Sequence, residues 1–290
     1  MKHAVTRPNP PWRSRNGRLT VHQVPAWIDN LIWLITCNET GETAVVDGPE
    51  AGPTLEYCEA HGLRLTTILN THTHPDHIGI NLDLRRREAL DGMTVVGPAS
   101  RADQIPGLTV GVDEGDTVQL GATQGRVMLT EGHIDGHVSY VFDNVLLCGD
   151  TLFAGGCGRL FDGPPAKMFD SLQRLAALPA ETQICCAHEY TQDNLRFAWS
   201  LEPDNEALAE RIRQVWALRA TGGCTVPSRL SIEHATNPFL RSDSPSLVAA
   251  VRAALPQTTL DDPQQVFAAT RLLKDQGAYK KRGDEGLPLG

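Results

Sequence analysis

Three histidines and an aspartate crowd one short stretch of the chain, NTHTHPDHIGI, at residues 70–80. The whole sequence of 290 residues contains only 10 histidines, so this clustering needs a cause. Neutral imidazole nitrogen and carboxylate oxygen together favour zinc or another first-row divalent ion over calcium or magnesium. His72 and His74, with one residue between them, can chelate one cation. Asp76 and His77 can face a second, so the stretch favours a metal site over a solvated loop.

Further candidate ligands follow three other segments whose apolar residues are typical of strands. His133 and His137 come after residues 125–130, Asp150 after 144–148, and His188 after 182–186. Taken alone, a histidine such as His188 beside a strand is usually a hydrogen-bonded structural residue, and Asp150 could equally cap a turn. Because α/β folds place their sites at the carboxyl ends of strands, four such strand ends together favour one shared centre.

Seven of these side chains divide naturally between two ions with one bridging carboxylate. The first ion takes His72, His74 and His133, the second takes Asp76, His77 and His188, and Asp150 lies between them. The set contains no cysteine, so we do not expect a closed structural zinc site. We expect instead a site with open coordination positions for water. Two ions about 3.5–4 Å apart form a hydrolytic centre. We expect zinc, with iron or manganese as the alternatives.

The hydrophobic pattern predicts an α/β region followed by a helical one. Short apolar runs predict strands, and amphipathic runs between some of them predict helices at 53–62, 81–90 and 165–178. After residue 194 only helical patterns remain. The predicted strands are 19–24, 31–37, 43–47, 65–70, 94–97, 117–120, 125–130, 137–142, 144–148 and 182–186. We therefore expect a disordered basic arm (1–18), a catalytic domain (19–190) and a helical domain (191–290).

Composition excludes several classes of partner. The formal net charge of −9 argues against binding to nucleic acid or to an anionic membrane surface. No uncharged apolar run reaches the ~18 residues that a membrane span needs. The seven cysteines form no regular framework, which favours reduced thiols and a cytoplasmic protein. An anionic substrate must therefore meet a local basic patch.

The stretch THTHPDHIG resembles the H-x-H-x-D-H metal motif of the metallo-β-lactamase superfamily, and the later His, Asp and His follow in the order which that superfamily requires. Within it the chain is similar to the glyoxalase II (hydroxyacylglutathione hydrolase) family from about Val24 to Asp275. The segments that carry this closer resemblance are CGRLFDG, HEYT, NPFLR at 237–241 and RLLKD at 271–275. The resemblance implies an αββα sandwich with a C-terminal helical domain.

The resemblance also implies an activity. A metal-bound hydroxide would attack the thioester of S-D-lactoylglutathione and release D-lactate and glutathione, as in methylglyoxal detoxification. Asp76 and Asp150 would be the catalytic carboxylates beside that hydroxide. The expected partner is this small thioester alone, and the protein is expected to be a monomer.

The resemblance further places a set of side chains around the glutathione moiety: Arg159, Phe161, Tyr190, Arg271 and Lys274. Arg271 and Lys274, three residues apart, share a helix face; from spacing alone a solvated surface is the favoured reading, and only the family resemblance reverses it. Phe161 stands where some family members carry tyrosine, which removes one hydrogen bond to substrate. We expect His137 to orient a ligand from outside the metal set, or to be a packing residue.

Two other classes of function remain open at this point. The chain could be another hydrolase of the superfamily or a single-iron persulfide dioxygenase, although seven ligands argue against a single ion. It could also be a catalytically silent metal-binding or redox module. Metal content measured with and without thioester turnover distinguishes these possibilities.

Overall fold

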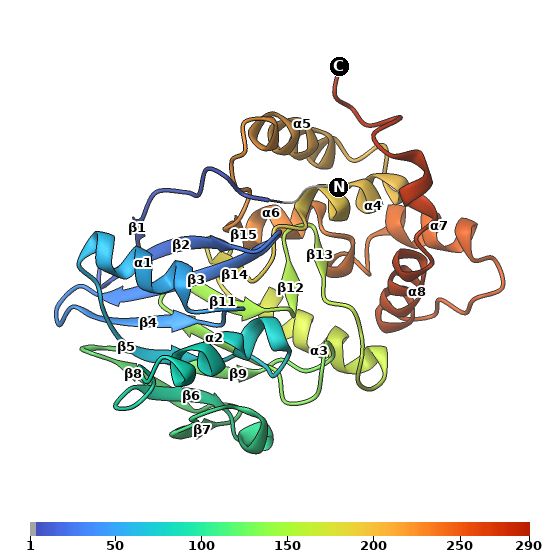
Figure 1. The fold of residues 1–290 in the computed structure, drawn as a ribbon. Helices are drawn as coiled ribbons and strands as arrows, with labels where there is room; N and C mark the ends of the chain where they lie inside the picture. The colour runs from blue at the N-terminus through green and yellow to red at the C-terminus, as the bar shows by residue number, and fades with distance from the viewer. Residues whose placement is uncertain (1–3) are drawn as a thin grey trace.

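The computed structural model describes residues 4–290, in which two β-sheets face each other and carry helices on their outer faces (Figure 1). The first sheet has seven strands in the order β1 to β7, and the second has six in the order β15-β14-β11-β10-β9-β8. The first comprises β1 (Trp12–Arg13), β2 (Leu19–Ala26), β3 (Asn30–Cys37), β4 (Glu42–Val46), β5 (Arg64–Leu69), β6 (Thr94–Pro98) and β7 (Val110–Val112). The second comprises β15 (Ser228–Arg229), β14 (Gln183–Cys186), β11 (Val145–Gly149), β10 (Val138–Phe142), β9 (Thr123–Leu129) and β8 (Thr117–Leu120).

The main core lies where the two sheets meet. Strand β3 is buried at all eight positions, as its nearly continuous apolar sequence NLIWLITC requires of a strand covered on both faces. The indole of Trp33 contributes to this core, and its Nε1 donates a hydrogen bond to the Cys186 carbonyl of β14 at 2.9 Å. That bond joins the two sheets near the edge where β14 ends.

Helices α1 (Gly52–His61) and α2 (Pro75–Arg86) cover the outer face of the first sheet. From α2, Ile80 and Leu84 pack in one cluster with Ile32 and Ile68 of the sheet. Helix α3 (Pro165–Ala176) lies on the second sheet and buries one apolar face in the main core. This αββα arrangement confirms the predicted fold.

The C-terminal helices gather at one end of the sandwich, coloured gold to red in Figure 1. They are α4 (Thr191–Leu201), α5 (Glu206–Ala220), α6 (Leu230–Thr236), α7 (Pro245–Ala254), α8 (Pro263–Gln276) and the 3₁₀ turns η2 (Pro238–Leu240) and η3 (Ala278–Arg282). Strand β15 belongs to this region yet pairs with β14. A boundary at residues 190/191 therefore does not separate all the strands from the helices.

Helix α2 begins earlier than the sequence pattern indicated. We expected a loop through the histidine motif and a helix at 81–90, but the helix starts at Pro75 and ends at Arg86. Proline is favoured in the first turn because its missing N–H has no partner there in any case. Asp76 and His77 therefore lie on the first helical turn, where the helix dipole favours the negative charge of Asp76.

The N-terminal segment is ordered over residues 4–18, contrary to the expected disordered arm at 1–18. Strand β1 pairs with β2, and the Asn9 side chain donates to the Val226 carbonyl at 2.7 Å. The backbone N–H groups of Thr6 and Arg7 both donate to Gly222 O. Val226 and Gly222 lie more than two hundred residues away in the sequence, so no local pattern predicts these contacts. Residues 1–3 lie outside the described part of the chain.

A buried ion pair holds the helical region to the hairpin formed by β12 (Leu152–Phe153) and β13 (Gly156–Cys157). Glu233 of α6 is fully buried and pairs with Arg211 of α5. The same carboxylate accepts hydrogen bonds from the Ser228 hydroxyl, from Asn237 Nδ2 at 3.0 Å and from the Gly155 backbone N–H at 2.7 Å.

None of the helices within residues 4–290 has the length and apolar character that crossing a bilayer requires.

Glu233→Ala should lower the free energy of unfolding by about 3–5 kcal/mol, because it leaves the Arg211 charge buried without its partner. Urea denaturation measures this change. The control Glu210→Ala removes the pair with Arg213 on the exposed face of α5 and should change the stability little. Equal stability of Glu233→Ala and wild type would show that this network does not hold the helices in place.

Candidate active site

The first group of candidate ligands is His72, His74 and His133, which the sequence assigned to one ion. His72 Nε2 and His133 Nε2 each lie 3.0 Å from His74 Nδ1. His72 and His74 lie between β5 and α2, whereas His133 lies in the loop after β9. One ring nitrogen from each histidine lies within 4.8 Å of the other two, so a single cation can contact all three.

The second group is Asp76, His77 and His188, which also meet as expected. Asp76 Oδ2 lies 3.6 Å from His77 Nε2 and 3.3 Å from His188 Nε2. Asp76 and His77 lie on the first turn of α2, and His188 follows β14. Ligand atoms that bind a tetrahedral zinc at about 2.0–2.2 Å lie roughly 3.3 Å apart, so these distances suit one ion.

Asp150 follows β11 and lies between the two groups. Its Oδ1 is 3.5 Å from His77 Nε2 and 3.4 Å from His188 Nε2. Its Oδ2 is 3.5 Å from His133 Nε2. Each oxygen thus faces a different group, which is the position that a bridging carboxylate needs, and the combined His/Asp clusters suggest a binuclear metal site.

Two atoms of this site test whether its residues fit metal ions. His77 Nε2 and Asp150 Oδ1 are buried, and neither has a hydrogen-bond partner within the described residues. An unsatisfied buried polar group costs about 1–3 kcal/mol. Coordination of a divalent cation would satisfy both atoms, and the nitrogen and oxygen donor set suits zinc, iron or manganese. The residues therefore fit the ions.

Carboxylates behind the rings fix how two of the histidines point. His77 Nδ1 lies 2.9 Å from Asp47 Oδ2, and His188 Nδ1 lies 2.9 Å from Asp29 Oδ1. Such a partner sets the tautomer and the orientation of the ring and makes the other nitrogen a better ligand. Nε2 of both rings is thereby directed at the space between the two clusters.

Sequence reasoning missed both of these carboxylates. Asp47 is buried, adopts a positive φ of 54°, and also accepts hydrogen bonds from the Thr71 backbone N–H at 2.8 Å and the Thr71 hydroxyl at 2.7 Å. Because it follows β4 directly, the rule that singled out Asp150 could have found it. Asp29 lies in the turn between β2 and β3, where no spacing indicates its role.

The electrostatics of the cluster keep its carboxylates ionised. Burial raises the pKa of Asp150, but the charges of His188 and His77 outweigh burial and hold it well below its usual value. Burial lowers the pKa of His77, but Asp150 and Asp47 outweigh it and raise the pKa to about 10. The carboxylates thus depend on neighbouring positive charge, which metal ions would supply.

His137 lies outside both groups. It is completely buried, and its Nε2 accepts a hydrogen bond from the Asp150 backbone N–H at 3.2 Å. Its Nδ1 lies 3.2 Å from Thr130 Oγ1 and 3.1 Å from Thr151 Oγ1. Burial holds the pKa of His137 well below its usual value, so the ring is neutral and can accept this bond. These contacts favour a role in positioning the Asp150 loop.

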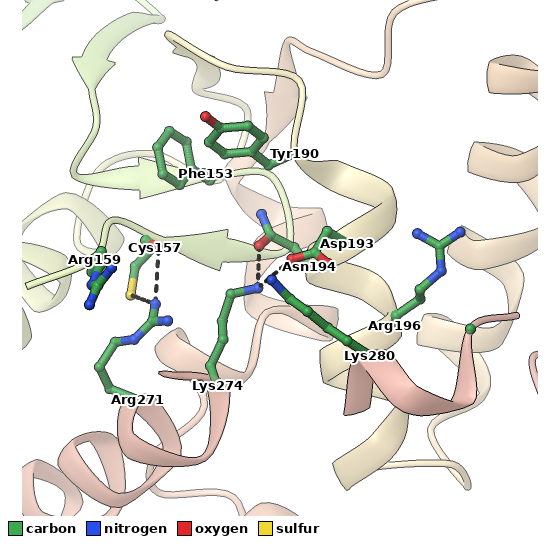
Figure 2. A pocket seen from close by; sticks show the side chains of 11 residues that line it. Phe153, Cys157, Arg159, Tyr190, Asp193, Asn194, Arg196, Arg271, Lys274 and Lys280 are labelled. Atoms are coloured by element: carbon green, nitrogen blue, oxygen red, sulfur yellow. Dashed lines mark hydrogen bonds and ion pairs between the residues drawn. The ribbon is translucent and has the colours of Figure 1, made fainter. Parts of the chain in front are cut away.

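A pocket of about 520 Å³, whose lining residues are drawn in Figure 2, shares contacts with the candidate metal cluster. Two residues connect it to the cluster. The Tyr190 ring stacks on His188 with centroids 4.8 Å apart, and the Arg159 carbonyl accepts a hydrogen bond from His133 Nδ1 at 2.7 Å. A ligand in this pocket therefore lies next to both metal groups.

Four of the five predicted substrate contacts line this pocket: Arg159, Tyr190, Arg271 and Lys274. Figure 2 shows Arg271 and Lys274 rising from α8 towards the floor of the pocket. Phe161 lies elsewhere. Its side chain is 57% exposed, and its ring centroid is 5.4 Å from that of His74 and 5.2 Å from that of His133. It therefore borders the mouth of the metal cluster.

The sequence analysis missed several other lining residues: Phe153, Asp193, Asn194, Arg196 and Lys280. Asp193, Asn194 and Arg196 come from α4, whose helical pattern gives no sign that one face meets a ligand. Lys280 lies beyond Asp275, where the family resemblance ended. Only the packing of α4, α8 and η3 around one space shows that these residues belong together.

Comparison with known proteins supplies the family. The model for the metallo-beta-lactamase superfamily matches residues 27–188, and that for the hydroxyacylglutathione hydrolase C-terminus matches residues 189–277. A hydroxyacylglutathione hydrolase from Methylococcus capsulatus is 50% identical over 260 residues, which are 89% of this chain and 98% of that protein. The chain belongs to the hydroxyacylglutathione hydrolase family. The relative from Gloeobacter violaceus is 48% identical over 260 residues, which are 89% of this chain and 100% of that protein.

Solved structures agree on the fold of this family member. The crystal structure of ETHE1 from Myxococcus xanthus matches with a TM-score of 0.56 at 23% identity, and the match covers 86% of this chain and 94% of the ETHE1 chain. At that identity the match supports the shared fold alone. The predicted family membership and fold are both confirmed.

Asp47→Asn should reduce metal affinity by about 10- to 100-fold, because loss of the partner carboxylate frees the His77 ring. Asparagine tolerates the positive φ at this position better than alanine does, so the fold should survive. Metal retained after dialysis against a graded chelator measures the effect. Asp91→Asn, at an exposed aspartate, is the control. Retention of metal equal to wild type would show that Asp47 does not orient His77.

Proposed function

We propose that this protein is a metal-dependent thioesterase that hydrolyses S-D-lactoylglutathione to D-lactate and glutathione. The observation that carries the proposal is the arrangement of two His/Asp clusters, joined by Asp150, beside a basic pocket in a member of the hydroxyacylglutathione hydrolase family. The clusters suit hydrolysis of an ester bond, and the basic pocket suits an anionic group attached to it. A glutathione thioester has both a hydrolysable bond and a negatively charged glutathione moiety.

The seven ligand residues would hold two divalent ions, zinc in the first place and iron or manganese as alternatives. They are His72, His74, Asp76, His77, His133, Asp150 and His188. When bound, such ions activate water at neutral pH and polarise a carbonyl oxygen.

The chain's own side chains set the geometry of the reaction. Asp150 keeps one carboxylate oxygen towards each group of histidines, and the His137 ring holds its backbone N–H. Asp76 Oδ2 accepts a hydrogen bond from Asn30 Nδ2 at 3.0 Å, which fixes this carboxylate at the open side of the cluster. The leaving thiol has an ordinary pKa of about 8.5, so it departs as thiolate with little acid assistance.

The pocket would bind the glutathione moiety through its charge. The protein carries a net charge of −9, yet the pocket is lined by five basic side chains (Arg159, Arg196, Arg271, Lys274 and Lys280) and one acidic side chain, that of Asp193. Glutathione carries two carboxylates, which this local excess of positive charge attracts. Phe161, beside the His74 and His133 rings, would border the acyl group instead.

Arg271 and Lys274 differ in how freely they can meet a substrate. Arg271 is 5% exposed, and its guanidinium donates to the Cys157 carbonyl at 3.3 Å and to Asp275 at 2.7 Å. Part of its role is therefore to join α8 to the β13 strand. Lys274 donates to Asn194 Oδ1 at 2.6 Å and lies 3.5 Å from Asp193, and both partners line the pocket, so substituting Lys274 leaves the link between α8 and β13 intact and makes it the cleaner probe of substrate binding.

We further propose that the protein acts in the cytoplasm as a monomer. The seven cysteines are all free and buried, which suits a reducing compartment. The cluster and the pocket are built from this one chain, so the proposed reaction needs no second copy.

Purified protein loaded with metal should hydrolyse S-D-lactoylglutathione and contain close to two ions per chain by elemental analysis. Asp150→Asn removes the charge between the clusters and should lower metal content and turnover together. The control Asp204→Asn, at an exposed aspartate, should alter neither. Metal-replete protein without thioester turnover would exclude the thioesterase and favour a silent metal-binding module. Full activity at one ion per chain would exclude the binuclear site.

The KM for this substrate should rise as pH passes the pKa of Lys274. Burial and the nearby Arg271 charge lower that pKa to about 8, although Asp193 opposes the shift. Below this pH the ammonium is charged and binds a carboxylate, and above it the charge is lost. Loss of a charge-assisted hydrogen bond costs about 1.5–3 kcal/mol, so KM should rise by roughly tenfold or more. The substrate carboxylate does not change charge in the reaction, so loss of the Lys274 charge should change kcat little.

Initial rates of wild type and Lys274→Arg across this pH range test the assignment. Arginine keeps its charge, so the variant should lack the rise in KM. The same rise in both proteins would assign the effect to a group other than Lys274.

A further inference from the structure

The last part of the chain forms a wall of the substrate pocket although it lies beyond the family match. The match to the hydroxyacylglutathione hydrolase C-terminus ends at residue 277. Immediately after it, the turn η3 contributes Lys280 to the lining of the pocket, and Gly283 follows. This segment, residues 278–287, is called the C-terminal wall below.

The C-terminal wall forms several hydrogen bonds with helices α4 and α5. Tyr279 is buried, and its hydroxyl donates to Asp193 Oδ2 at 2.7 Å. Asp284 accepts hydrogen bonds from Arg196 Nε at 2.6 Å and from Trp216 Nε1 at 3.2 Å. Further on, the Trp199 indole donates to the Gly286 carbonyl at 2.7 Å. These contacts hold the backbone that carries Lys280 in a fixed place.

Lys280 and Lys274 direct their ammonium groups to the same part of the pocket. The Tyr279 ring centroid lies 5.8 Å from Lys280 Nζ and 5.4 Å from Lys274 Nζ. Figure 2 shows the Lys280 side chain running along the pocket towards the end of Lys274. Within residues 4–290, Lys274 Nζ has Asn194 and Asp193 as polar partners, whereas Lys280 Nζ forms no hydrogen bond or ion pair and lies over the Tyr279 ring.

Two ammonium groups around one ring repel each other unless anions lie between them. Asp193 is the one carboxylate in the pocket lining: it pairs with Lys274, accepts a hydrogen bond from the Tyr279 hydroxyl, and also feels the charge of Lys280, so a single carboxylate is shared between the two ammonium groups. The neighbouring Lys281 belongs to the same basic turn but does not line the pocket, so the basic run alone does not explain the position of Lys280.

We propose that Lys280 is a specificity-determining residue, which binds a carboxylate of the glutathione moiety together with Lys274. This inference rests on the proposed function, because it assigns a ligand contact to the same pocket. The C-terminal wall thereby selects thioesters whose thiol carries negative charge. Lys280 does not reach the metal cluster, so it acts on binding and not on the chemical step.

The test compares Lys280→Ala with the matched control Lys281→Ala, using metal-replete protein. For S-D-lactoylglutathione, Lys280→Ala should raise KM by about three- to fivefold with kcat unchanged, the range typical of a partly exposed ion pair. The rise should shrink at high salt, because ions screen such a pair. Lys281→Ala should match wild type, as should Lys280→Ala with a lactoyl thioester of an uncharged thiol. An unchanged KM for the glutathione thioester, or an equal rise with the uncharged one, would overturn the proposal.

Binding of glutathione itself separates this inference from the proposed reaction. Titration calorimetry with wild type, Lys280→Ala and Lys281→Ala needs no turnover. Weaker binding by Lys280→Ala alone supports the contact even if the wild type hydrolyses no glutathione thioester, in which case only the proposed reaction fails. Equal affinity in all three proteins overturns the role of Lys280 and leaves the thioesterase activity to be judged by its own assay.

Discussion

The buried carboxylate of Asp150 is the constraint around which the rest of the site is arranged. An ionised carboxylate removed from water is costly unless positive charge surrounds it. Here His77 and His188 face one oxygen and His133 faces the other. Any shift of the carboxylate therefore changes its distances to both groups of histidines. Its backbone is held in turn by His137, so a neutral buried ring supports the charged centre from behind.

The sandwich makes this arrangement possible because its two sheets end at the same edge. His72 and Asp47 follow strands of the first sheet, whereas His133, Asp150 and His188 follow strands of the second. Neither sheet alone holds a complete set of ligands. The Trp33 hydrogen bond to Cys186, one of the links across the core, lies two residues from His188 and so helps to fix the distance between the two halves.

Sequence reasoning succeeded where a residue's role follows from its place at the end of a strand. The seven candidate ligands were singled out in this way and lie together in the structure, and the apolar runs predicted most strands, because both signals are local. Asp29 and the order of residues 4–18 were missed, since each depends on contacts with distant parts of the chain. The early start of α2 was missed because its first turn, which carries Asp76 and His77, lacks the apolar period that marks the rest of the helix.

The basic pocket explains how a chain with a net charge of −9 can accept an anionic substrate. Repulsion between exposed charges is screened within about 8–10 Å at physiological salt, so the overall charge is felt weakly inside a pocket. What matters there is the local balance, and the lining places several cations around the single carboxylate of Asp193. Each of these cations is costly to bury alone, and most are held by neighbours such as Asp275 or Asp284. Neither Asp275 nor Asp284 lines the pocket, so the ion pairs that they form stabilise Arg271 and Arg196 without adding negative charge to the lining.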